Sequence, residues 1–115
     1  MFSLPSDSGF APVLRGITIK TLVHGAATLL TEFRLERGSL LPPHSHPHEQ
    51  TGYLVSGRLR LRIDGKALEL APGAAWCVPP GVEHRAEALE DSVAVEVFSP
   101  CRADYLQYLD REAVG

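Results

Sequence analysis

The sequence lacks most of the features that mark a specialised class of protein. Its 115 residues carry 14 acidic and 11 basic side chains, a net charge of −3, and no cluster of lysines. A protein that binds phosphate backbones needs a basic patch, so we predict no nucleic-acid partner. No apolar stretch approaches the roughly 20 residues of a membrane-spanning helix, so we also predict no membrane partner.

Cysteine is scarce as well. Cys77 and Cys101 are far apart in the sequence, whereas a small secreted domain stabilised by disulfides is rich in cysteine. We therefore expect two reduced, buried thiols. Residues 1–9 lack the basic segment and apolar run of a secretory signal. Both observations favour a cytoplasmic location.

Short runs of alternating apolar residues, separated by glycine and proline, fill most of the chain. A period of two is typical of strands with one buried face, and it occurs at residues 17–23, 29–35, 59–63 and 93–97. Asp64-Gly65 predicts a hairpin turn, because a type I′ turn needs positive φ at both central positions. Since the length suits a single domain, we predict one all-β sandwich or barrel over residues 13–100.

The two ends of the chain have a different character. Residues 1–12 are rich in serine, proline and glycine, which predicts an N-terminal arm. Residues 101–115 are predicted to form a short C-terminal helix and a tail. The helix is expected from Arg102 to Leu109, with Asp104 in its first turn.

Three of the five histidines lie between His44 and His48. Imidazole is the commonest metal ligand among side chains, and a strand directs residues two apart to the same face. His44 and His46 can therefore face one ion, and Gln50 follows at the same parity. His48 shares that parity, but Pro47 predicts a break in the strand. We place His48 outside the coordination shell and expect it to contact a substrate.

Two glycine-bounded segments contain these residues. The first runs Gly38, five residues, His44-x-His46, three residues, Gln50, six residues, Gly57, and the second runs Gly73, five residues, Pro79-x-Gly81, two residues, His84. In this pattern the chain resembles the cupins. The resemblance implies a jelly-roll barrel and one divalent transition metal held by His44, His46, Gln50 and His84. Three imidazoles and one oxygen donor suit Zn, Ni, Fe, Co or Mn.

Gln50 stands where cupins usually have glutamate. A neutral amide leaves the positive charge of the metal less compensated, which strengthens its action as a Lewis acid. It also disfavours a higher oxidation state, which anionic ligands would stabilise. The substitution therefore favours polarisation of a substrate oxygen over oxygen chemistry, and the alternative is a site that has lost its metal.

The last apolar run permits two interpretations. Alternation alone places Val93, Val95 and Val97 in the core and Glu96 and Phe98 on a solvated face. The sequence from Val95 to Leu106, however, is similar to the end of small single-domain cupins of pectin degradation. That resemblance implies that Glu96 and Phe98 are catalytic and that Arg102 binds the substrate carboxylate, although the acidic residue of those proteins is usually aspartate.

The resemblance implies a metal-dependent enzyme that opens and ketonises a 4,5-unsaturated monouronate or a similar small sugar acid. A cupin dioxygenase or lyase acting on a small acid is one alternative, and a non-catalytic cupin that binds a small ligand is another. We expect a homodimer, both from the family and because sheet edges need to be covered.

Overall fold

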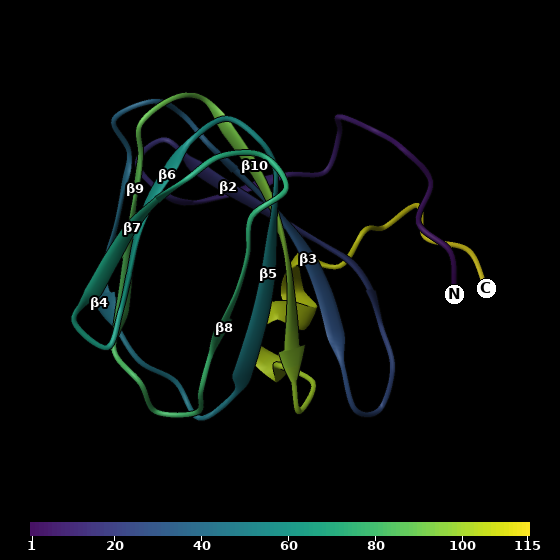
Figure 1. Ribbon diagram of the computed structural model, residues 1–115. Helices are drawn as coiled ribbons and strands as arrows, with labels where there is room; N and C mark the ends of the chain where they lie inside the picture. The colour runs from purple at the N-terminus through teal and green to yellow at the C-terminus, as the bar shows by residue number, and fades with distance from the viewer.

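The computed structural model describes all of residues 1–115 and confirms the prediction of an all-β fold, built here from two antiparallel sheets. It contains ten strands and one 3-10 helix: β1 (Ala11–Leu14), β2 (Ile17–His24), β3 (Leu29–Leu35), β4 (Leu40–His44), β5 (Glu49–Ser56), β6 (Leu59–Ile63), β7 (Lys66–Leu70), β8 (Ala75–Val78), β9 (His84–Ala88), β10 (Ser92–Ser99) and η1 (Ala103–Tyr108). All pairs between neighbouring strands are antiparallel. One sheet has the order β1-β2-β3-β10-β5-β8, and the other has the order β4-β9-β6-β7 (Figure 1).

The core lies between the two sheets. The strands show the expected alternation, and every second residue of β3 is buried. Ile19, Leu29 and Leu54 are fully buried and belong to one apolar cluster. Their removal from water is the main favourable contribution to folding.

The turn between β6 and β7 is the predicted one. Asp64 has φ 50° and Gly65 has φ 80°, and Ile63 pairs with Lys66 directly beside them. Positive φ at both central residues is the type I′ geometry, whose twist matches that of the flanking strands.

Pro42 and Pro43 lie in β4, which is an edge strand of the four-stranded sheet. Proline has no N–H to donate to a second neighbour, so an edge position suits it. The register of β4 against β9 shifts between Leu41 and His44. This irregularity lies immediately before the first histidine of the predicted site.

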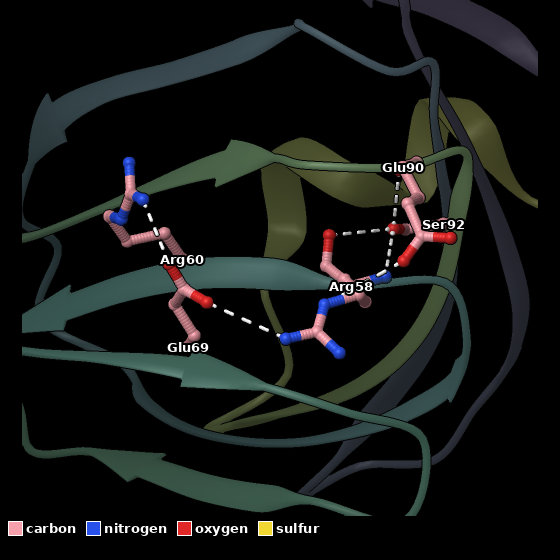
Figure 2. Close-up of polar contacts among 5 residues, drawn as sticks. All are labelled: Arg58, Arg60, Glu69, Glu90 and Ser92. Carbon is pink, nitrogen blue, oxygen red and sulfur yellow. Dashed lines mark hydrogen bonds and ion pairs between the residues drawn. The ribbon is translucent and has the colours of Figure 1, made fainter.

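The outer face of the four-stranded sheet is charged. Arg60 contacts Glu69 at 2.9 Å, and Arg58 contacts Glu69 and Glu90 at 3.5 and 3.6 Å (Figure 2). All four side chains are about half exposed, and ion pairs of this kind contribute about 0–1 kcal/mol each. Arg58 and Arg60 thus lie on a solvated face.

The predicted short C-terminal helix is present as η1. Its Tyr105 ring packs edge-on against Phe33 and Phe98, at centroid distances of 6.3 and 5.3 Å.

The chain ends lie side by side (Figure 1) because Phe2 pairs with Val114. The proposed limit of the N-terminal arm at residue 12 falls inside β1. None of the helices could span a bilayer.

Two expectations about individual faces are wrong. Alternation alone placed the valines of β10 inside, but Ala94 and Phe98 are the buried residues, and the valines are only partly covered. Because the valine face of β10 is itself partly buried, the apolar residues of this strand do not identify the face that points into the barrel. Cys77 is exposed rather than buried, although both cysteines are free as expected.

Candidate metal centre

Three histidines from separate parts of the chain meet at one end of the barrel interior. His44 is the last residue of β4 and His84 is the first of β9, and the two are directly paired in register. Their ring centroids are 4.0 Å apart. His46 follows in the connection to β5, and one ring nitrogen from each of the three lies within 4.8 Å of the others. The three histidines could hold a metal ion.

Each of the three imidazoles is oriented by a backbone carbonyl two residues away. The Nδ1 atoms of His44, His46 and His84 lie 2.8, 3.0 and 2.9 Å from the oxygens of Pro42, His48 and Val82 respectively. A carbonyl oxygen only accepts, so each Nδ1 carries a proton, and in the neutral form of each ring the lone pair lies on Nε2. Metal-binding histidines are oriented in this way.

The Nε2 atoms have no suitable partner within the protein. That of His84 is buried without a hydrogen bond. That of His46 lies 2.8 Å from Gln50 Oε1, which places two acceptors against each other. Burial lowers the pKa of His46 and lowers the pKa of His84 to about 4, so both rings are neutral near pH 7. A cation bound by these atoms would satisfy all of them, and the residues present therefore fit a metal.

Gln50 is buried, and its amide is held in one orientation by Glu96. Gln50 Nε2 donates a hydrogen bond to Glu96 Oε2, which directs Gln50 Oε1 toward His46. The second carboxyl oxygen of Glu96 accepts a hydrogen bond of 2.9 Å from Trp76 Nε1. Burial raises the pKa of Glu96 to about 7, against the smaller effect of these hydrogen bonds. The carboxyl group predicted to be catalytic thus lies next to the predicted oxygen ligand.

Phe98 and Arg102 continue the site toward η1. The Phe98 ring is fully buried and lies edge-on to His46, with centroids 5.6 Å apart. Arg102 stacks over Tyr105, 3.9 Å from its ring centroid, and lies 5.0 Å from that of Phe98. Its Nε donates to Asp104 at 3.1 Å, and none of the hydrogen bonds involves its two Nη groups. These groups are available to a carboxylate.

His48 lies beside the site but outside the group of three histidines. Its ring centroid is 5.7 Å from that of His46, and its Nδ1 is buried without a hydrogen bond. The backbone oxygen of His48 orients His46. Contact between the His48 ring and a substrate stays a prediction.

Trp76 is the member of the site that the sequence did not reveal. Its side chain is partly buried and packs against the core. That its partner is Glu96 could not be foreseen, because no motif links strands β8 and β10. The pairing of both strands with β5 is the feature that brings the two side chains together.

Known proteins resemble this chain in sequence and in fold. Residues 31–100 match the Cupin domain family. The chain is 30% identical over 93 residues to the pectin degradation protein KdgF of Dickeya dadantii (strain 3937), covering 79% of this chain and 84% of that protein. The structure of KdgF from Halomonas sp. superimposes with a TM-score of 0.86 at 33% identity, covering 90% of this chain and 96% of the other. An RmlC-like cupin from Shewanella frigidimarina gives the same TM-score at 26% identity, covering 90% and 94%.

Proposed function

This chain belongs to the cupin family and is a homologue of KdgF. From that relationship we propose that it is a metal-dependent enzyme. Its proposed reaction opens and ketonises a 4,5-unsaturated monouronate or a similar small sugar acid. One observation carries the proposal. The Glu96 carboxyl, with its pKa raised to about 7, is hydrogen-bonded to the side chain that completes the histidine site. An acid/base group beside a Lewis acid is what such a reaction needs.

The proposed ligands are His44, His46, His84 and Gln50. A divalent metal bound there supplies a Lewis acid that polarises a substrate oxygen. Imidazole and amide groups bind a metal as neutral ligands, so this set would leave the charge of the metal almost uncompensated. This favours Lewis-acid chemistry over a redox cycle.

The reaction needs proton movement but no oxidant. Ring opening breaks the bond between the ring oxygen and the hemiacetal carbon. The hydroxyl of that carbon loses its proton and becomes an aldehyde, and the ring oxygen gains a proton and becomes the hydroxyl of an enol. Ketonisation removes the proton from the enol oxygen and adds one to the neighbouring carbon. A carboxyl group whose pKa is about 7 is present in both forms at neutral pH, so Glu96 can take the first proton and deliver the second.

Arg102 and Phe98 are proposed to orient the substrate. The free Nη groups of Arg102 suit a bidentate pair with the carboxylate of a uronate. Stacking on Tyr105 and the contact with Asp104 restrict the guanidinium, so less freedom is lost on binding. Phe98 supplies an apolar wall between that carboxylate and His46.

The proposal is tested with Glu96→Ala and His44→Ala, each assayed for bound metal and for loss of the ultraviolet absorbance of an unsaturated monouronate. At saturating metal we expect Glu96→Ala to keep the bound ion and lose turnover by about a hundredfold or more, and His44→Ala to lose both. Glu112→Ala, which removes an exposed carboxyl in the C-terminal tail, is the control. Undiminished turnover in Glu96→Ala would remove the acid/base role.

The same assays separate the alternatives. Consumption of dioxygen that depends on ferrous iron would indicate a dioxygenase, and a tightly bound small acid without turnover would indicate a binding protein. The homodimer and the cytoplasmic location remain predictions.

A further inference from the structure

Glu96, Gly52 and Trp76 form a single row across three strands. Strand β5 lies between β10 and β8 (Figure 1), and Gly52 pairs with Glu96 on one side and with Trp76 on the other. Directly paired residues direct their side chains to the same face of a sheet. Neighbouring strands are about 4.8 Å apart, so Glu96 and Trp76 start from backbones separated by about 10 Å. Any side chain at position 52 would stand between them.

The missing side chain of Gly52 is what allows the contact. A Cβ built on Gly52 would lie 2.2 Å from both Nε1 and Cε2 of Trp76. The indole therefore occupies the space that a side chain would fill, and its Nε1 reaches Glu96 Oε1 at 2.9 Å. Gly52 has no positive φ, so the requirement for glycine here comes from space rather than from backbone conformation.

Glu96 is consequently held from two sides. Trp76 donates to one carboxyl oxygen and Gln50 donates to the other. A glutamate side chain has three rotatable bonds and would otherwise adopt several rotamers, whereas an indole has only two and is packed against the core. The rigid partner in this pair is Trp76.

We propose that Trp76 is a positioning residue: its indole N–H holds the Glu96 carboxyl, and through Glu96 it keeps Gln50 Oε1 directed toward the three histidines. Gly52 is the gap across β5 that makes this contact possible. The inference rests on the proposed function for its catalytic consequence, but the contact itself has consequences for metal binding and for fluorescence that do not depend on turnover.

Trp76→Phe is the main variant, because it keeps an aromatic ring and removes the N–H. At saturating metal we expect kcat to fall about tenfold, in line with the loss of a hydrogen bond to a charged group, while KM changes less than about twofold. The affinity for zinc, measured by competition with a chromophoric chelator, should fall about tenfold, the low end for partners outside the coordination shell. Tyr53→Phe is the matched control, since it alters an exposed aromatic residue on β5.

Gly52→Ala and a double variant test the mechanism. Gly52→Ala should reproduce the loss of kcat and of zinc affinity, because its Cβ displaces the indole. Adding Trp76→Phe to Glu96→Ala should lower kcat no further, since the only partner through which Trp76 acts is absent. An additional tenfold loss in that background would overturn the positioning role.

The chain has one tryptophan, so its emission reports on this contact directly. In metal-free protein, Glu96→Gln should change the emission of Trp76, whereas Glu112→Gln should not. If the wild-type protein turns over no uronate, the proposed function fails while emission and zinc affinity still decide the present inference. Unchanged emission in Glu96→Gln, or unchanged zinc affinity in Trp76→Phe, would refute it.

Discussion

Glu96 gives the metal-free protein a dependence of stability on pH whose size follows from the structure. Burial raises its pKa from the ordinary 4.5 to about 7. Between these values the folded state holds a proton that the unfolded chain has released, so the free energy of unfolding falls as pH rises. At about 1.4 kcal/mol per pKa unit, the shift of roughly 2.5 units corresponds to about 3 kcal/mol, lost between pH 4.5 and about pH 7.

His84 acts in the opposite direction over nearly the same interval. Burial lowers its pKa from 6.5 to about 4, so the unfolded chain binds a proton that the folded state excludes. Stability from this source rises by about 3 kcal/mol as pH rises from about 4 to 6.5. Between pH 4.5 and 6.5 the effects of Glu96 and His84 oppose each other, so the free energy of unfolding of the wild type should change little with pH there.

Glu96→Gln separates the two effects. The variant has no carboxyl to titrate, so its stability minus that of the wild type should increase by about 3 kcal/mol from pH 4.5 to about pH 7 and stay constant outside that interval. Every other group contributes equally to both proteins and cancels in the difference. The contribution of His84 remains in the variant, so the free energy of unfolding of Glu96→Gln should itself rise with pH.

The assay is urea unfolding followed by far-ultraviolet circular dichroism, with a chelator present throughout. Fluorescence is avoided because Trp76 contacts the substituted residue. Glu112→Gln serves as the control and should track the wild-type profile. A difference between Glu96→Gln and wild type that does not vary with pH would refute the view that Glu96 is buried as a carboxyl that resists ionisation.

Two predictions concern the scaffold. Leu54→Ala should lower the free energy of unfolding by about 2–5 kcal/mol in urea titrations, because Leu54 is fully buried in the core. Leu68→Ala, at a side chain that is 56% exposed, should change the free energy of unfolding by less than about 0.5 kcal/mol. Equal losses in the two variants would contradict the assigned core. Gly65→Ala should cost about 1–2 kcal/mol in thermal unfolding because its φ is +80° and no neighbour would contact the new Cβ. In Gly25→Ala the new Cβ also meets no neighbour, but Gly25 has no positive φ, so this variant should show no comparable loss of stability in thermal unfolding.

Parts of the fold were predictable because their determinants are local. Alternation identified the strands at residues 17–23, 29–35, 59–63 and 93–97, and Asp64-Gly65 identified the turn between β6 and β7. The jelly-roll topology came from the resemblance to the cupins. The resemblance to the cupins predicted that His84 joins His44 and His46, and these three do form one group. The physical reason given for the first pair was incomplete, however. His44 ends β4 and His46 lies in the loop before β5, so the two converge through a bend between sheets and not along one strand.

The side of β10 that faces the interior was not predictable from alternation. Valine is more apolar than glutamate, so the rule favoured the valine face, but the barrel interior here also contains a polar site. A buried carboxyl is tolerated because Gln50 and Trp76 satisfy both of its oxygens. These hydrogen bonds join residues from three strands, so no local sequence pattern predicts them. Resemblance to a family supplied the orientation that periodicity could not.

Gln50 and Glu96 are best understood as one unit. Each is in direct contact with the other, so a glutamate at position 50 would place two carboxylates against each other. One of the pair would then have to keep a proton, because like charges at that separation do not both ionise. An amide at position 50 removes this conflict: it offers an oxygen to the histidine site and an N–H to Glu96 at the same time. In the proposed mechanism the Glu96 carboxyl is therefore not a ligand itself, and it lies one hydrogen bond away from the proposed ligand Gln50.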